Sequence, residues 1–195
     1  MNIKNLKLIF FIVVLINSIF PSPSFLKSIY KTPVKLWQKL SYSTPFLDCQ
    51  FEPSCSNYFL HAIDSTGIIN GTIIGADRIV RCNPGARHYH LQKDNPTFYI
   101  DGRIIDYVSF KKSTKKQSNY VYYSIIPGFG RAKIGRQIDG LFSFLMVSSS
   151  LYKGHKFKNT HPNIAGFYIT LGSIFWISDF YGTWRTAKSA TNRNK

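Results

Sequence analysis

The amino-acid sequence predicts a mainly α-helical protein: a small cysteine-containing helical hairpin domain, followed by a linker and a C-terminal membrane helix pair. Two observations predict this fold class. Apolar residues recur every three or four positions within residues 54–82, as along one face of a helix. Residues 159–178 contain no Asp, Glu, Lys or Arg, which suits a helix that crosses a hydrocarbon core of about 30 Å. We therefore divide the chain into an N-terminal signal peptide or membrane anchor (1–24), a helical domain (25–90), a polar and basic linker (91–119) and a membrane-associated helical hairpin region (120–195).

The charge balance predicts an anionic partner. The chain has 25 Lys and Arg residues against 9 Asp and Glu residues, a formal net charge of +16. Such a surplus attracts nucleic acid and anionic lipid alike. The basic residues lie beside apolar runs, which favours anionic membrane lipid. The sequence has no recognisable module with a basic, base-reading face, so we expect no nucleic-acid partner.

Residues 1–24 have the pattern of an export signal or of an anchor. Lys4 and Lys7 precede an apolar run, and the small residues Ser22 and Ser24 follow it. This order is typical of a secretory signal peptide. The same apolar run, extended as a tilted or interfacial helix, also fits a membrane anchor that is retained, and both interpretations stay open.

Residues 25–42 predict a basic amphipathic helix. Trp37 suits the headgroup zone of a bilayer, and the apolar residues lie on a different face from four lysines. We expect Pro33 to interrupt the segment, with Thr32 capping a helix that runs to about Tyr42. Either the lysines attract lipid, or the apolar face packs on the cysteine-containing block and the lysines face water. The four lysines, at four-residue spacing, are Lys27, Lys31, Lys35 and Lys39.

Residues 49–84 hold all three cysteines of the chain and predict a helical hairpin. The first helix covers residues 54–65 and stops at Gly67. We expect Thr72 to cap a second helix, which ends before Pro84. His61 lies on the polar side of the first helix and is expected to face solvent.

This hairpin places Cys55 and Cys82 at its outer ends, and Cys49 is close to Cys55 in sequence, so we expect the three thiols to converge. Three interpretations of the cluster stay open. Two of the cysteines form a disulfide, or the three bind zinc with His88 or His90 as fourth ligand, or small buried thiols pack the hairpin ends.

The remaining segments show no catalytic motif. Residues 86–119 are polar and predict a weak β-hairpin that turns at Asp101 and Gly102. No GxSxG context surrounds a serine, and the glycine-rich stretch 127–140 lacks the GK[ST] of a phosphate-binding loop. We therefore expect neither an enzyme nor a cofactor. We also expect Asp179, with Trp184 and Arg185, to close the apolar run at an interface-like boundary. A basic patch precedes residue 120 and consists of Lys111, Lys112, Lys115 and Lys116.

Two short motifs carry a resemblance to a known family. The first reads C-x-F-x-P-S-C-S-x-Y and the second reads R-x-x-R-C-x-P. Their residues are Cys49, Phe51, Pro53, Ser54, Cys55, Ser56 and Tyr58, then Arg78, Arg81, Cys82 and Pro84. Over about residues 28–85 the chain resembles the YidD family of membrane protein insertion efficiency factors, which is also labelled a haemolytic domain.

This resemblance implies a small, non-enzymatic helical protein at the bacterial inner membrane. Its role would be to help membrane proteins insert near the YidC insertase and the Sec translocon, on a side of the membrane that stays open. The family has no established catalytic residues, so none is carried over. A second class fits the export-like start: an exported, disulfide-stapled structural or membrane-perturbing protein of the haemolysin kind. Residues 120–195 resemble small bacterial membrane-hairpin domains with a PGxGxxxxG motif, which implies two membrane-associated helices.

Overall fold

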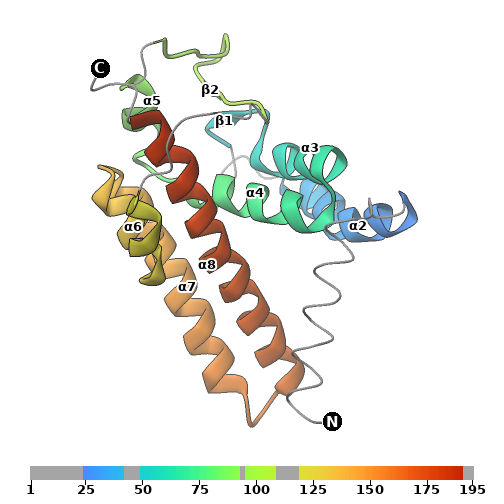
Figure 1. The fold of residues 1–195 in the computed structure, drawn as a ribbon. Coiled ribbons are helices and arrows are strands. Elements are labelled where there is room, and N and C mark those ends of the chain that lie inside the picture. The colour runs from blue at the N-terminus through green and yellow to red at the C-terminus, as the bar shows by residue number, and fades with distance from the viewer. Residues whose placement is uncertain (1–23, 42–48, 93–94, 109–118, 191–195) are drawn as a thin grey trace.

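Two short antiparallel helices, α3 and α4, lie between an outer helix α2 and a long helical pair, α7 and α8 (Figure 1). The computed structural model describes residues 24–41, 49–92, 95–108 and 119–190. The mainly α-helical class is confirmed. The elements are α2 (Ser24–Ser41), β1 (Phe51–Glu52), α3 (Cys55–Thr66), α4 (Ile68–Arg81), α5 (Ala86–Leu91), β2 (Ile104–Ile105), the 3₁₀ helix η1 (Asn119–Ile125), α6 (Phe129–Lys133), α7 (Gln137–Phe157) and α8 (Pro162–Ala190). The proposed signal or anchor before Ser24, and the basic patch 111–116, lie outside the described residues.

A single glycine separates α3 from α4. Gly67 has φ +86°, a left-handed value that favours glycine, and it both ends α3 and begins α4. Because α4 begins at Ile68, Thr72 lies inside the helix, where its hydroxyl donates to the Ile68 carbonyl. The expected cap at Thr72 was therefore wrong. At the other end of the hairpin, Ser54 accepts a hydrogen bond from the Asn57 N–H and caps α3.

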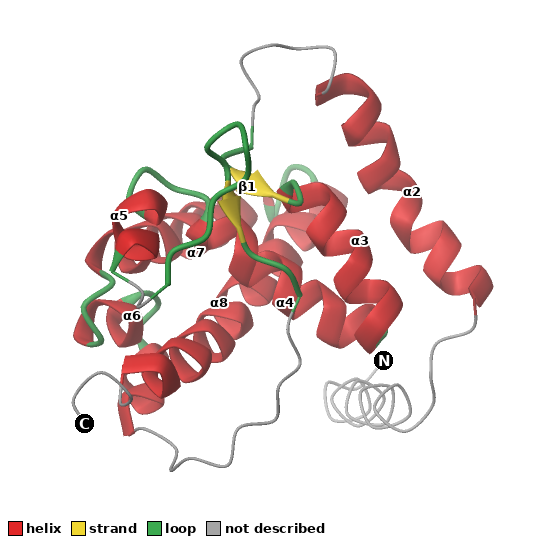
Figure 2. Cartoon of the chain, turned by 90° about the horizontal axis from the view of Figure 1, so that it is seen from above, coloured by secondary structure: helices red, strands yellow, loops and turns green. Residues whose placement is uncertain are grey.

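Helix α2 is continuous through Pro33, contrary to the expected interruption. Proline removes one backbone donor from the helix and crowds the preceding turn, but it does not always end the helix. The Thr32 hydroxyl donates to the Ser28 carbonyl, so Thr32 lies within the helix instead of capping a new one. Figure 2 shows α2 lying along α3, on the side away from α7 and α8.

Residues 97–106 return to the hairpin instead of leading away from it. Gly102, at φ +84°, supports the expected turn, and an isolated antiparallel bridge joins Phe98 to Ile104. The returning strand β2 then pairs in parallel with β1, with Phe51 opposite Ile104. This segment is therefore part of the cysteine-containing domain, and the expected linker boundary at residue 91 does not match the structure.

The long helices α7 and α8 form an antiparallel hairpin whose tip points away from α3 and α4 (Figure 1). Among the described residues, one helix is long and apolar enough to cross a membrane, Pro162–Thr186 within α8. The structure therefore supports one such helix and not the expected pair. Helix α8 continues beyond Asp179, which is fully buried, and the interface-like boundary expected there stays a prediction.

The C-terminal half packs directly on α4. Ala76 and Val80 of α4 form one buried cluster with Val147 of α7 and Phe175 of α8. Helices α7 and α8 are therefore not a separate unit attached by a linker. They bury one side of the α3–α4 hairpin, and α2 lies on another side (Figure 2).

Candidate functional site

The three cysteines meet at the open end of the α3–α4 hairpin. Cys49 precedes β1, Cys55 is the first residue of α3, and Cys82 follows the last residue of α4. Their sulfur atoms all lie within 4.8 Å of one another, and the Cys49 and Cys55 Sγ atoms are 3.4 Å apart. All three are free and half-buried thiols. The convergence expected from the hairpin is therefore confirmed.

Hydrogen bonds distinguish the three thiols. Hydrogen bonding with Cys55, and then with Cys82, lowers the pKa of the Cys49 thiol. The backbone N–H of Cys55 also donates to Cys49 Sγ, at 3.2 Å. The same thiol–thiol interactions raise the pKa of Cys55, and its burial acts in the same direction. Negative charge in this cluster is thus favoured first on Cys49.

Neither histidine proposed as a fourth zinc ligand joins the thiols. His90 is buried, with Nε2 2.8 Å from the Thr97 carbonyl, and its ring packs edge-on against Phe98. The exposed His88 lies 2.9 Å from Gln92. Within the described residues, the group of possible metal ligands consists of the cysteines alone.

An open groove of about 1140 Å³ begins at the thiol cluster. The side chains of Glu52, Ser56 and Arg103 give parts of its wall a polar character. Its apolar wall comes from four helices and consists of Trp37 of α2, Phe59 of α3, Ile79 of α4, and Phe142 and Met146 of α7. The groove therefore offers thiols, charges and a largely apolar wall in one place.

Arg78 of the second motif contacts three residues of the first motif. Its fully buried guanidinium lies 4.1 Å from the centre of the Phe51 ring and 4.3 Å from the centre of the Tyr58 ring. It donates to the Pro53 carbonyl at 3.0 Å and to the Asp106 carbonyl at 2.6 Å. Phe51, Pro53 and Tyr58 therefore all contact the same arginine. A cation over two aromatic rings is a favourable arrangement.

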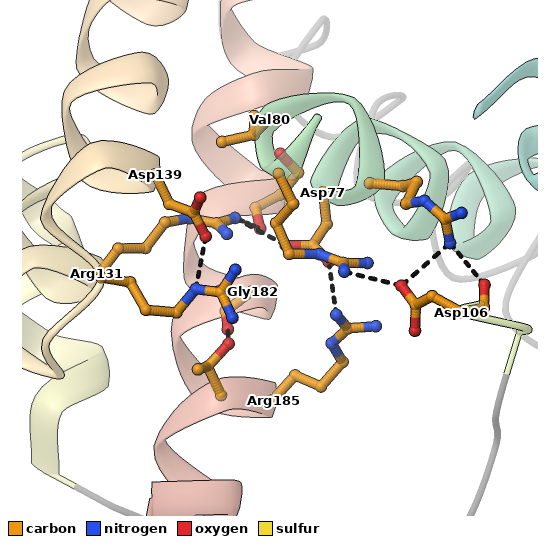
Figure 3. Close-up of polar contacts among 12 residues, drawn as sticks. Asp77, Val80, Asp106, Arg131, Asp139, Gly182 and Arg185 are labelled. Atoms are coloured by element: carbon orange, nitrogen blue, oxygen red, sulfur yellow. Dashed lines mark hydrogen bonds and ion pairs between the residues drawn. The ribbon is translucent and has the colours of Figure 1, made fainter. Parts of the chain in front are cut away.

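A buried ionic network continues from Arg78 and Arg81 into the C-terminal half. Figure 3 shows its carboxylates Asp77 and Asp106 and its arginines Arg131 and Arg185. Arg81 donates to Asp77 at 3.0 Å and to Asp106 at 2.8 Å. Arg131 of α6 donates to Asp77 at 2.7 Å and to Asp179 of α8 at 2.7 Å, and all three side chains are fully buried. The network therefore connects α4, α6 and α8 through charges.

Opposite charges determine the ionisation of this network. Burial alone would raise the pKa of Asp77, but the positive charges of Arg81, Arg185 and Arg131 outweigh it and hold that pKa well below its usual range. The pKa of Asp106 is lowered in the same way, against its burial, by Arg81, Arg185 and Arg78. Both carboxylates are therefore ionised in the folded protein at neutral pH.

Residues 26–90 match the family described as "Putative membrane protein insertion efficiency factor" (YidD). Relatives of the same description include proteins of Thermotoga neapolitana, 45% identical over 53 residues (26% of this chain and 65% of the relative), and of Aquifex aeolicus, 36% identical over 59 residues (30% of this chain and 87% of the relative). The chain belongs to the YidD family. It spans 65% of the Thermotoga neapolitana relative and 44% of two further Thermotoga relatives. No solved structure matches the chain.

The YidD-matching segment includes α2, whose polar side faces α3. Lys31 pairs with Asp64, Gln38 donates to Asn57 at 2.8 Å, and the Tyr30 hydroxyl lies 2.9 Å from the Thr72 hydroxyl. Four large apolar side chains of α2 face outward and are about half exposed or more: Phe25, Ile29, Leu36 and Leu40. Trp37, 54% exposed, borders the groove. The interpretation in which this apolar face packs on the cysteine-containing block is therefore wrong.

The four lysines of α2 that were predicted to attract lipid divide into two pairs. Lys27 donates to the Asp64 carbonyl at 3.2 Å, and Lys31 forms the ion pair with the Asp64 carboxylate. Lys35 and Lys39 are exposed. Of the remaining motif residues, Ser56 lines the groove, and Pro84 lies in the turn between α4 and α5. Lipid contact by the lysines stays a prediction.

Several residues of the site were missed by the sequence-based interpretation. Gln50 donates to the Asn83 carbonyl at 3.0 Å and lies 3.8 Å from Cys82 Sγ. Asp77 carried one usable signal, because it precedes Arg81 by one helical turn on an otherwise apolar stripe. The partners of Asp77 in α6 and α8 gave no signal in the sequence, because Arg131 is 54 residues away from Asp77 in the chain.

Proposed function

We propose that the protein is a non-enzymatic accessory factor that helps integral membrane proteins insert into the bacterial inner membrane. Membership of the YidD family supports this role, because the relatives are named for membrane protein insertion efficiency. One observation carries the proposal: α2 turns its polar side to α3 and its apolar side outward. A helix oriented in this way binds in the interface of a bilayer or against another apolar surface.

The exposed fractions of the α2 side chains favour the bilayer as its partner. Phe25 is 70% exposed, Leu36 58% and Leu40 61%, so most of their apolar surface faces solvent in the absence of a membrane. Lys35 and Lys39 are also exposed and lie on the flank of this apolar face, given 3.6 residues per turn. Each lysine near an anionic surface contributes about 1 kcal/mol of attraction. Lys27 and Lys31 contribute less to this attraction, because both bind Asp64.

The α7–α8 hairpin is the second proposed point of membrane attachment. At 1.5 Å per residue, Asp179 lies about 26 Å along α8 from Pro162, close to the thickness of a hydrocarbon core. The ionic network would then remain at the membrane surface while the hairpin tip enters the bilayer. The tip carries basic side chains, Lys153, Lys156 and Lys158, which are long enough to reach a polar interface.

The groove is the proposed docking place for a client. Its apolar wall, with Trp37, Phe59 and Met146, suits the side chains of an unassembled transmembrane segment. Its polar parts, with Arg103, suit the segment's flanking residues. The insertion machinery, YidC or the Sec translocon, is the proposed neighbour that delivers or receives this segment, as the family resemblance implies.

An insertion assay tests the proposal. Purified full-length protein is added to inverted inner-membrane vesicles from a bacterium that lacks its own YidD-family protein, and the membrane-inserted fraction of a newly synthesised single-span protein is measured. Wild-type protein is expected to raise this fraction. Leu36→Gln is expected to require about tenfold more protein or more for the same effect, because burial of one leucine contributes about 1.5–3 kcal/mol.

The matched control is Ser28→Gln, an exposed position on the same helix off the apolar face. It is expected to match wild type. Quenching by brominated lipid, compared between wild type and Trp37→Phe, reports whether α2 itself lies in the bilayer. An inserted fraction that is the same with and without the protein would refute the insertion role. An absence of Trp37 quenching would refute the proposed placement of α2.

A further inference from the structure

We propose that Cys49, Cys55 and Cys82 form a three-thiolate site for a zinc ion, with the fourth coordination position open to the groove. Nothing in the insertion role requires or supplies a metal, so this site is independent of the proposed function. It rests on the positions of the three sulfur atoms, on the N–H groups that surround them, and on their access to the groove.

The sulfur positions are close to those of a zinc site. Sulfur atoms at about 2.3 Å from a tetrahedral zinc ion lie about 3.8 Å from one another. The Cys49 and Cys55 Sγ atoms are 3.4 Å apart, and no pair within the cluster exceeds 4.8 Å. Shifts of less than about 1 Å in side chains that are only half-buried therefore suffice to place all three around one ion.

N–H groups point at the sulfur atoms, as around metal-bound thiolates. The backbone N–H of Cys55 donates to Cys49 Sγ at 3.2 Å, and the Gln50 amide donates toward Cys82 Sγ at 3.8 Å. Such donors stabilise the negative charge of a thiolate and orient it toward the metal. Gln50 is itself fixed by the Asn83 carbonyl, at 3.0 Å, so its donor is held in place.

The fourth position has no side-chain ligand from the described residues. No imidazole or carboxylate joins the three sulfur atoms, whereas all three cysteines line the groove. A water molecule from the groove can therefore complete a tetrahedral zinc ion, as in sites with three protein ligands. Each thiol releases its proton to solvent on binding, so binding weakens as the pH falls.

Packing alone explains this arrangement less well than a metal site does. Thiols that only fill space need no N–H donors and need not border an open groove. A disulfide would join only two of the three sulfur atoms. The three come from separate parts of the chain, before β1, at the start of α3 and after α4, yet all their sulfur atoms meet at one point.

Cobalt(II) is the probe for the test, because it replaces zinc and reports sulfur ligands by absorption. The full-length protein is kept in detergent with its thiols reduced, stripped of metal, and titrated with Co²⁺. We expect one Co²⁺ per chain, sulfur-to-cobalt charge-transfer absorption, and tetrahedral bands that disappear when Zn²⁺ is added. The chain has 3 Cys in total, so the charge-transfer signal reports this cluster alone.

Matched variants identify the ligands. Cys49→Ser, Cys55→Ser and Cys82→Ser are each expected to lose about a third of the charge-transfer intensity and to bind at least tenfold more weakly, since each removes one of three thiolates. Gln50→Ala keeps the ligands but removes an N–H donor, and is expected to bind about 10–100-fold more weakly. His88→Ala, an exposed histidine outside the cluster, is the control and is expected to bind like wild type.

A second measurement does not depend on the variants folding. X-ray absorption by zinc-loaded wild-type protein is expected to show three sulfur neighbours at about 2.3 Å and one lighter neighbour. Wild-type protein with three reduced thiols that binds no Co²⁺ would overturn the proposal. So would loss of binding in His88→Ala, or a Cys49–Cys55 disulfide found by mass spectrometry in protein isolated without reductant.

Discussion

At the scale of single residues, Arg78 and Arg131 show how a buried arginine is compensated by its partners. Arg78 holds Phe51, Tyr58 and the Pro53 carbonyl at the thiol end of the hairpin. Arg131 lies between two carboxylates from different helices. A planar guanidinium with several donors can satisfy these partners together, whereas the single ammonium of lysine cannot.

Arg78→Lys is therefore expected to lower the free energy of unfolding by about 3 kcal/mol, because stacking and several charge-assisted hydrogen bonds are lost. Arg87→Lys is the matched control. Arg87 also lies over an aromatic ring, Phe98 at 5.3 Å, but it is exposed, so we expect a much smaller change. Chemical unfolding in detergent, followed by circular dichroism, measures both. Equal losses would contradict the role assigned to Arg78.

The lowered pKa values of Asp77 and Asp106 predict how stability depends on pH. A carboxyl group whose pKa falls on folding stabilises the protein above its unfolded value, here 3.8, and this contribution is lost as the pH falls through the folded value. Thermal stability is expected to be steady from neutral pH to about pH 5 and to fall below about pH 4. Asp106→Asn is expected to be less stable at neutral pH and less sensitive to acid.

A melting temperature of Asp106→Asn that falls with acid as steeply as that of wild type would contradict this assignment. It would mean that other carboxyl groups carry the acid sensitivity. Thermal scans of both proteins across the same pH series make the comparison.

At the scale of elements, glycines determine how closely helices approach. A Cβ atom at Gly71 of α4 would lie 2.5 Å from the Cα atom of Ile63, so the backbones of α3 and α4 leave no room for it. At Gly166 of α8 nothing lies within 4 Å of the corresponding Cβ position. The two sites differ in packing although both are helical glycines.

Gly71→Ala is accordingly expected to destabilise the protein by about 2 kcal/mol or more, since the hairpin must open to admit the methyl group. Gly166→Ala is expected to be neutral or to stabilise by up to about 1 kcal/mol, because alanine favours helix more than glycine does. Melting temperatures of the two variants against wild type provide the measurement. A Gly71→Ala protein as stable as Gly166→Ala would show that α3 and α4 do not pack at this distance.

The sequence predicted elements better than it predicted their orientation. The spacing of apolar residues and Gly67 predicted the helices on both sides of the turn, and the hairpin then brought Cys55 and Cys82 together. The same kind of pattern identified two faces on α2 but not which one turns inward, because that choice depends on partners such as Asp64. Pro33 misled the interpretation, since α2 is continuous through it.

At the scale of the whole molecule, α7 and α8 cover one side of the α3–α4 hairpin, and α6 joins them through the ionic network. The match to the Aquifex aeolicus relative covers 59 residues, which are 87% of that protein. The rest of that relative is too short to contain an equivalent of α6–α8. In this chain those helices cover Ala76 and Val80, and they supply Arg131 to Asp77. No local pattern could predict this, because the contacts join segments about 50 residues apart and each partner alone resembles an ordinary surface charge.

Removal of residues 120–195 tests this interdependence. The truncated chain keeps Arg81 beside Asp77 but loses Arg131 and Arg185, so we expect it to be much more sensitive to protease than the full chain. Asp77→Asn should then have opposite effects in the two contexts. It is expected to destabilise the full chain, where three arginines face Asp77, and to protect the truncated one, where the carboxylate is poorly compensated.

Limited proteolysis of the four proteins, wild type and Asp77→Asn in both lengths, gives the comparison. If Asp77→Asn changes protease resistance in the same direction in both lengths, the network does not connect the two halves energetically.

The inward polar side of α2 also determines how easily one wall of the groove can open. Trp37 and Ser41 line the groove, and α2 is held to α3 and α4 by polar contacts of Lys31, Gln38 and Tyr30 and by the stacking of the Tyr30 ring on Phe59. Such contacts contribute about 1 kcal/mol each, far less than the burial of a helix's apolar face. We therefore expect detachment of α2 to be a local opening, well below global unfolding in free energy, and the bilayer contact proposed for its apolar face would favour it further. Such an opening would widen the groove, and the client segment proposed above would enter from the side of α2 while the rest of the fold stays closed.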